Sequence, residues 1–321
     1  MKRSDFFKLA VAAGLSLESV LDRGLEASAQ KTPGPLPRRP LGSTGELLSV
    51  IGLGGIVVSS ETQAHANEVV REAFEGGVNY FDVAPTYGDA EDRLGPALEP
   101  FRSKVFLACK TVERDAAGSQ RELEASLKKL RTDYFDLYQL HAITTREDIE
   151  KIFGPSGAME TFVRARQQGK VRYLGFSAHS VEAALAAMER FDFDTILFPI
   201  NYGCWFKGGF GPQVVEKAHG KGMGILALKP GAHSRRGKSQ EPKYGKCWYQ
   251  PLETEKEIAR SYYFTLSLPV TAALPPGEEK FWRMALDVAR SFIPVTKVET
   301  LALKEKAASL DPLFEYPAWQ G

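Results

Sequence analysis

The sequence predicts a (β/α)8 barrel with an N-terminal β-hairpin and a C-terminal helical extension. Three observations support this fold: short apolar runs follow one another after residue 40, helical patterns separate them, and no GxGxxG motif follows the first run. Most runs are continuously apolar, which is typical of parallel strands buried on both faces. An open doubly wound sheet, the competing fold, requires the glycine motif. The eight runs are residues 48–55, 78–84, 105–109, 135–140, 171–177, 195–200, 224–229 and 270–276.

The segments between the runs have the spacing of amphipathic helices. Residues 119–131 place Leu123, Leu127 and Leu130 on one helical face, and residues 278–290 show the same pattern. A helix of this kind can return the chain to the start of the next parallel strand.

The N-terminal residues 1–29 differ from the rest and resemble a twin-arginine export signal. They have a basic start, a short apolar run and small residues near the end, but Ser4 follows Arg3 where a second arginine is expected. The alternative is a disordered or helical tail. Residues 30–38 predict a proline-rich linker, and residues 39–321 predict a single barrel domain. A functional signal implies a periplasmic protein; without one, the protein is cytoplasmic.

The composition favours a small-molecule partner. With 41 basic and 40 acidic residues the net charge is +1, so no strong field attracts nucleic acid or a membrane, and we expect neither as a partner. The three cysteines, Cys109, Cys204 and Cys247, form no CxxC pair and no metal-binding spacing. A disulfide between Cys204 and Cys247, and the oligomeric state, are left open.

Polar side chains stand at the ends of three neighbouring runs. The second run ends near Asp82, with Tyr87 in the loop that follows, the third ends at Lys110, and the fourth ends at His141. The C-terminal ends of barrel strands meet at one rim, so these side chains are expected to lie together. Because a buried carboxylate requires a partner, we expect Asp82 to pair with Lys110.

These four residue types fit protonation of a carbonyl oxygen. A free tyrosine has a pKa of about 10, and a nearby ammonium lowers it. We therefore expect Lys110 to lower the pKa of Tyr87, Asp82 to fix Lys110, and His141 to donate a hydrogen bond to a substrate carbonyl. The hydride for the carbonyl carbon must come from a nicotinamide cofactor, because side chains do not supply one.

The arrangement of Asp82, Tyr87, Lys110 and His141 resembles that of the aldo-keto reductases. This resemblance implies that Tyr87 is the general acid, that an aldehyde or ketone is reduced to an alcohol, and that NADP(H) provides the hydride, with NAD(H) as the alternative. It extends from about residue 39 to residue 290. The supporting motifs are "RPLGSTGELLSVIGLGG" (39–55), "GGVNYFDVAPTYG" (76–88), "SLKKLRTDYFDLYQLH" (126–141) and "GKVRYLGFSAHS" (169–180).

The resemblance also implies a cofactor site on the later strands. The loop at 231–253 is long, basic and aromatic. It is expected either to cover the cofactor and line the pocket with Trp248 and Tyr249, or to be a solvated surface loop. The cofactor-binding residues expected from the resemblance are Ser177, Asn201, Lys229, Gly277, Lys280 and Arg283.

Several positions depart from the family pattern. Ala178 follows Ser177 where the family has asparagine, Leu197 replaces a glutamine, and Leu228 stands where a tyrosine often stacks on the nicotinamide. Glu278 and Glu279 lie where a cofactor phosphate would be repelled, although both also suit a helix N-terminus.

Two other functions are consistent with parts of the sequence. A non-catalytic cofactor-binding or regulatory protein on the same scaffold would explain the altered nicotinamide contacts. A metal-dependent barrel hydrolase would use His141, His179 and His233 with Asp82 around a divalent ion, but it leaves Lys110 unexplained. The sequence does not identify the carbonyl substrate.

Overall fold

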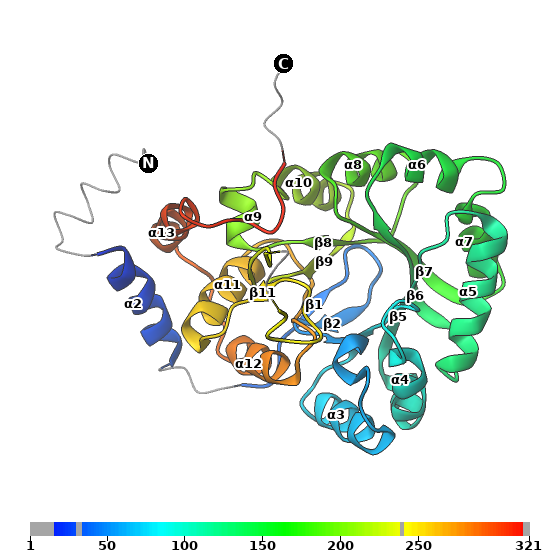
Figure 1. The fold of residues 1–321 in the computed structure, drawn as a ribbon, viewed down its shortest axis with the longest axis horizontal. Helices are drawn as coiled ribbons and strands as arrows, with labels where there is room; N and C mark the ends of the chain where they lie inside the picture. The colour runs from blue at the N-terminus through cyan, green and yellow to red at the C-terminus, as the bar shows by residue number, and fades with distance from the viewer. Residues whose placement is uncertain (1–15, 30–33, 238–240, 317–321) are drawn as a thin grey trace.

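The computed structural model describes residues 16–29, 34–237 and 241–316. Within these residues, eight parallel strands surround one axis and helices cover their outer side (Figure 1). The strand order is β12-β9-β8-β7-β6-β5-β4-β3, and a parallel bridge between Ile51 and Ala273 joins the two ends. The predicted (β/α)8 barrel is therefore confirmed. Its strands are β3 (Leu53–Gly54), β4 (Tyr80–Asp82), β5 (Phe106–Thr111), β6 (Phe135–Ile143), β7 (Val171–Ala178), β8 (Thr195–Pro199), β9 (Gly224–Leu228) and β12 (Ala272–Leu274).

The helices alternate with these strands, and several begin at a side-chain cap. Thr62 accepts a hydrogen bond from His65 N at the start of α3, and Thr145 forms a capping box with Asp148 at α6. The described helices are α2 (Leu17–Ala29), α3 (Gln63–Glu75), α4 (Ala90–Leu98), α5 (Ala116–Lys129), α6 (Arg146–Phe153), α7 (Ala158–Gln167), α8 (Val181–Arg190), α9 (Tyr202–Phe206), α10 (Pro212–Gly220), α11 (Glu255–Ser267), α12 (Glu279–Arg290) and α13 (Lys297–Ala307), with 3-10 turns η1 (Gly55–Val58) and η2 (Glu99–Lys104).

The predicted N-terminal hairpin closes the bottom of the barrel. Strands β1 (Arg38–Pro40) and β2 (Leu47–Ser49) pair antiparallel. Their turn contacts the start of β9 so closely that a Cβ at Gly42 would lie 2.3 Å from Gly224 N. Apolar side chains from the hairpin and the strands fill one continuous inner core: Leu41, Leu48, Tyr80, Phe106, Ala108, Leu137, Leu197, Leu226, Ala272 and Leu274.

The C-terminal helical extension is also present, as α13, and it packs against α2 and α9 (Figure 1). Val20 and Leu21 of α2 join a buried cluster with Tyr202, Phe264 and Leu303. No helix in the described part of the chain is both long and apolar enough to cross a membrane. The export signal at 1–29 stays a prediction, since residues 1–15 lie outside the described residues, as do residues 30–33 of the predicted linker.

A long segment after β9 folds back over the rim of the barrel. We call residues 232–251, apart from the undescribed 238–240, the strap. Its two ends pair as β10 (Ala232–Ser234) and β11 (Gln250–Pro251). In its middle, Lys246 Nζ donates to Val57 O at 2.6 Å and contacts Glu61 at 2.8 Å. Cys109, Cys204 and Cys247 are all buried and unpaired, so Cys204 and Cys247 form no disulfide here.

Candidate active site

Asp82 and Lys110 form a buried ion pair at the C-terminal rim of the barrel. Asp82 ends β4 and is 1% exposed, and Lys110 lies near the end of β5 and is 0% exposed. Lys110 Nζ contacts Asp82 Oδ1 and donates a hydrogen bond to Val83 O at 3.1 Å. Burial acts to lower the pKa of Lys110, but the charge of Asp82 and the neighbouring Tyr87 outweigh it, and the pKa is raised. Lys110 is therefore held as an ammonium.

The second carboxylate oxygen of Asp82 is also satisfied. The Tyr80 hydroxyl donates a hydrogen bond to Asp82 Oδ2 at 3.2 Å, and Gln139 Nε2 donates a second one to the same atom at 3.1 Å. The sequence interpretation missed both residues. Their spacing is the signal that could have found them: Tyr80 precedes Asp82 by two positions and Gln139 precedes His141 by two, and strand residues two apart share a face.

Tyr87 lies in the loop after β4, beside this ion pair. Lys110 Nζ is 5.1 Å from the centroid of its ring, and the ring meets that of His141 edge-on at a centroid distance of 5.9 Å. Burial raises the pKa of Tyr87, and the opposing effect of the Lys110 charge is smaller. The expectation of a net lowered pKa is therefore wrong, although the lysine acts in the expected direction. Tyr87 keeps its proton at neutral pH.

His141 is positioned by an irregularity in β6. The pairing of β6 with β7 shifts register between Leu140 and Ile143, and Ala142 adopts a φ of 53°. Ala142 N donates to Ser177 Oγ at 2.7 Å, which holds this bend in place. Burial lowers the pKa of His141 to about 3, and the charge of Lys110 acts in the same direction, so the imidazole is neutral. Its buried Nδ1 has no hydrogen-bond partner among the described residues.

Two of these side chains, Asp82 and Tyr87, border a cavity of about 300 Å³ at the rim, beneath the strap. Asp82 and Tyr87 line one part of it, and Lys229, Trp248 and Tyr249 line another. A larger groove of about 660 Å³ lies between α2, α11 and α12 on the outside of the barrel. We place the candidate site at the smaller cavity, because only there, among the described hollows, does a buried ion pair meet a tyrosine.

Four of the residues expected to hold a cofactor lie at the same rim. Ser177 lies one residue before the end of β7, Gly277 and Lys229 line the cavity, and Asn201 follows β8. The side chain of Asn201 is already used by the protein: its Oδ1 accepts from Cys204 N at 2.8 Å, and its Nδ2 donates to Lys229 O at 3.1 Å. Asn201 therefore shapes the rim through backbone contacts.

The other two, Lys280 and Arg283, lie on α12 outside the cavity and are exposed. Lys280 Nζ donates to Tyr244 Oη at 2.9 Å. Arg283 donates two hydrogen bonds to Glu72, at 2.9 and 2.8 Å, and contacts Glu279 at 3.0 Å. The guanidinium of Arg283 is thus already paired with two carboxylates.

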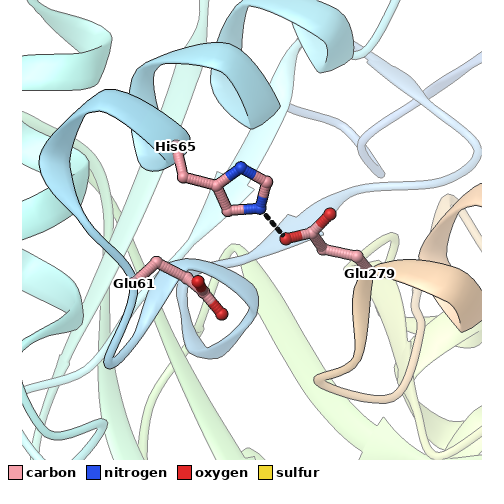
Figure 2. A group of neighbouring side chains, drawn as sticks. All are labelled: Glu61, His65 and Glu279. Atoms are coloured by element: carbon pink, nitrogen blue, oxygen red, sulfur yellow. Dashed lines mark hydrogen bonds and ion pairs between the residues drawn. The ribbon is translucent and has the colours of Figure 1, made fainter.

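Figure 2 shows a cluster of Glu61, His65 and Glu279 between the start of α3 and the start of α12. One ligand atom from each lies within 4.8 Å of the others, and among the described residues this is the one group with the spacing of a metal site. Each carboxylate is already bound by a cation, Glu61 by Lys246 and Glu279 by Arg283. We therefore interpret the cluster as an ion-pair network that fastens the strap.

The histidines expected for a metal-dependent hydrolase do not form such a group. His141 and His179 follow β6 and β7, but His233 lies exposed on β10. The described residues contain no metal-spaced group that includes Asp82 or any of these histidines.

Replacing Glu279 with glutamine is expected to lower the pKa of His65 toward the ordinary value of a histidine. The hydrogen bond that His65 donates to Glu279 is the largest cause of the raised pKa of His65 in the folded protein. The interaction stabilises the fold fully below about pH 6.5 and is lost as the pH rises through the raised folded pKa. An NMR titration of the His65 ring measures the change, with Glu68→Gln as the control, because Glu68 is 66% exposed and lies 3.8 Å away. An unchanged titration in Glu279→Gln would contradict the assignment.

The comparisons with known proteins agree with this geometry. The model of the aldo/keto reductase family matches residues 50–271. The chain is 33% identical over 155 residues to an oxidoreductase of Bacillus subtilis, covering 44% of this chain and 48% of the relative. It is 27% identical over 210 residues to L-galactose dehydrogenase of Arabidopsis thaliana, covering 60% and 64% of the two chains. It is 35% identical over 136 residues to methylglyoxal reductase of Escherichia coli, covering 40% and 45%. The chain thus spans about half to two thirds of the length of these relatives.

Solved structures show the same fold. An aldo-keto reductase of Bacillus halodurans in its holo form superposes with a TM-score of 0.67 at 21% identity, over 89% of this chain and 100% of the other. A Pseudomonas aeruginosa protein of the same kind gives a TM-score of 0.64 at 24% identity, over 82% and 98%. The family match covers well over half of the sequence, and the chain belongs to the aldo/keto reductase family.

Proposed function

We propose that this oxidoreductase reduces an aldehyde or ketone to an alcohol, with Tyr87 as the general acid and NADP(H) as the hydride donor, NAD(H) being the alternative. One observation carries the proposal: a protonated tyrosine borders a cavity beside a buried Lys110–Asp82 pair and the neutral His141. The family, and relatives named as a dehydrogenase and a reductase, support this reaction class.

The residues of the cavity fit the reacting half of a nicotinamide dinucleotide. Ile56, Leu228 and Pro276 provide an apolar wall. Ser177 is not a lining residue of the cavity; it is 1% exposed near the end of β7, where its hydroxyl accepts a hydrogen bond from Ala142 N and keeps its own proton to donate. When bound, the cofactor supplies a hydride to the carbonyl carbon. The fit is weaker for a 2'-phosphate, because Arg283 would have to release Glu72 or Glu279. We therefore expect NADPH and NADH to differ in affinity by less than about tenfold, a difference of 1.4 kcal/mol.

The protein's own residues account for the proton transfer. The neutral His141 orients the carbonyl oxygen by a hydrogen bond, and the Tyr87 hydroxyl gives its proton to that oxygen. The phenolate left behind lies beside the Lys110 ammonium, which stabilises the new negative charge. Asp82 holds the ammonium in position and cannot move, because Tyr80 and Gln139 also bind it.

Titration of the full chain with NADPH and NADH tests the proposal. Trp248 lines the cavity, so saturable quenching of tryptophan fluorescence is expected with both cofactors. Oxidation of the bound cofactor by a panel of aldehydes and ketones is then expected. Absence of binding by either cofactor would contradict the proposal.

A non-catalytic cofactor-binding protein is the second candidate. The use of the Asn201 side chain within the protein favours it, because both polar atoms of that amide already bond Cys204 N and Lys229 O and so hold a cofactor less readily. It predicts cofactor binding without oxidation by any carbonyl of the panel, which the same experiment distinguishes.

A further inference from the structure

Lys229 follows β9 in a conformation that turns it into the candidate active-site cavity. Its φ is 61°, in the left-handed region that costs a non-glycine residue about 1–2 kcal/mol. Its carbonyl oxygen accepts hydrogen bonds from Asn201 Nδ2 and from Ala232 N, both at 3.1 Å. The surrounding protein therefore enforces a strained backbone at this position, and the side chain lines the cavity.

The ammonium of Lys229 faces aromatic rings and no carboxylate. Its Nζ lies 5.2 Å from the ring centroid of Trp248 and 4.9 Å from that of Tyr249. Lys229 forms no ion pair with any described residue, and the charge of Lys110 repels the Lys229 ammonium. Lys246, the other lysine lining the cavity, is paired with Glu61. Lys229 is thus the lysine of this cavity that lacks a counterion.

An unpaired ammonium in this position is costly without a ligand. Burial lowers the pKa of Lys229 to about 8, with Lys110 acting in the same direction and Cys247 opposing them. The side chain is still mainly charged at neutral pH. An anion that enters the cavity would therefore meet a cation that has no carboxylate partner and is already positioned over two aromatic rings.

Lys229 also lies close enough to the reacting residues to act on them through its charge. Its charge lowers the pKa of His141 and, as the largest influence after burial, that of His179. It shares the cavity with Tyr87, the proposed acid. A group bound by Lys229 therefore lies in the same cavity as the proposed acid.

We propose that Lys229 binds a carboxylate of the substrate, so that the compounds reduced here are oxo acids, aldehydes or ketones that carry a carboxylate. This inference rests on the proposed carbonyl reduction. Trp248 and Tyr249 contact the apolar body of such a molecule, while Lys229 binds its anionic end. The same charge could instead meet a phosphate of the dinucleotide, and the experiment separates these two sources.

The test compares 4-carboxybenzaldehyde with 4-carbamoylbenzaldehyde, which differ in charge but hardly in shape. The wild-type protein is expected to prefer the carboxylate by at least about tenfold in kcat/KM, and Lys229→Met is expected to remove this preference, mainly through KM. Lys229→Arg is expected to retain it, because the charge remains. Lys243→Met is the control, because Lys243 is an exposed strap lysine outside this cavity whose charge is already paired with Glu253, and it should leave the preference within twofold.

Two outcomes would overturn the proposal. One is a wild-type protein that reduces both aldehydes equally well. The other is a Lys229→Met variant that loses affinity for NADPH and NADH while keeping the carboxylate preference, which would assign the charge to the cofactor phosphates. Thermal unfolding checks the fold of the variant, which is expected to be at least as stable as the wild type because a half-buried charge without a carboxylate partner has been removed.

A binding measurement separates this inference from the proposed function. Calorimetry without cofactor is expected to show at least about tenfold tighter binding of benzoate than of benzamide to the wild type, and no such difference in Lys229→Met. If no carbonyl is reduced but this difference is present, the reductase proposal fails and the anion site stands. If carbonyls are reduced and the difference is absent, the anion site fails alone.

Discussion

The Tyr87→Phe variant is expected to lose about 10³-fold or more in kcat/KM for carbonyl reduction, within the range of roughly 10²–10⁴ for a general acid. Phenylalanine preserves the ring that packs against His141 and Lys110 but removes the proton that the carbonyl oxygen receives. The loss is expected in kcat, because the hydroxyl acts chiefly in the transition state. Steady-state kinetics with the best aldehyde of the panel measures it.

Tyr173→Phe is the matched control for this change. Tyr173 lies in β7 at the opposite end of the barrel, where its hydroxyl donates to Thr44 O at 3.1 Å. Its removal should leave kcat/KM within about twofold, since surface changes away from a site have small effects. Cofactor affinity should be retained in Tyr87→Phe. If that variant kept more than a tenth of the activity, the acid would have to be another group.

Replacing Lys110 with methionine is expected to destabilise the folded protein by about 3–5 kcal/mol, the usual result of breaking a buried ion pair from one side. The change leaves the Asp82 carboxylate without its cation at a position that is 1% exposed. Tyr80 and Gln139 still donate to it, but neither carries a charge. Denaturant unfolding, with the free energy extrapolated to water, measures the loss. Reduction activity should fall as well, because the phenolate of Tyr87 loses its neighbouring cation.

The double variant Asp82→Asn with Lys110→Met measures the interaction between these two residues apart from their contacts with the rest of the protein. Asparagine removes the uncompensated charge and can still accept from Tyr80 and Gln139. The double variant should therefore recover a large part of the stability lost in Lys110→Met, with a coupling energy within the range of about 0.5–3 kcal/mol known for contacting residues. If the stability losses of the two single variants simply add up to the loss of the double variant, the two charges do not stabilise each other.

The fold could be predicted because its signal is local and repeated. Each barrel strand is marked by its own apolar run, but a run does not show which other strand its residues pair with. Residues 48–55 look like one strand, whereas the structure divides them between the hairpin, which ends at Ser49, and β3, which begins at Leu53. The intervening Gly52 lies where a Cβ would be 2.5 Å from the Tyr80 ring, a restriction that only the folded structure reveals.

The candidate site was predictable only where neighbouring strands determine it. Asp82 and Lys110 meet because β4 and β5 are adjacent and parallel. The direction of the Tyr87 pKa shift depends on burial, which no local pattern records. Likewise, one of the two carboxylates that pair with Arg283 belongs to Glu72, more than 200 positions earlier in the chain. Spacing along the sequence predicts contacts between adjacent strands, but it does not predict ion pairs between distant loops and helices.

The position of α2 has a consequence for proteolytic maturation. Arg260 of α11 is 5% exposed, and its guanidinium is bound by Glu18 and Asp22, both carried by α2. Cleavage by a signal peptidase after residue 29 would remove both carboxylates and uncover the apolar surface of Phe264 and Leu303. A processed chain would therefore have a different surface charge and a new apolar patch on this side of the barrel. Processing here would change the surface of the mature barrel as well as its length.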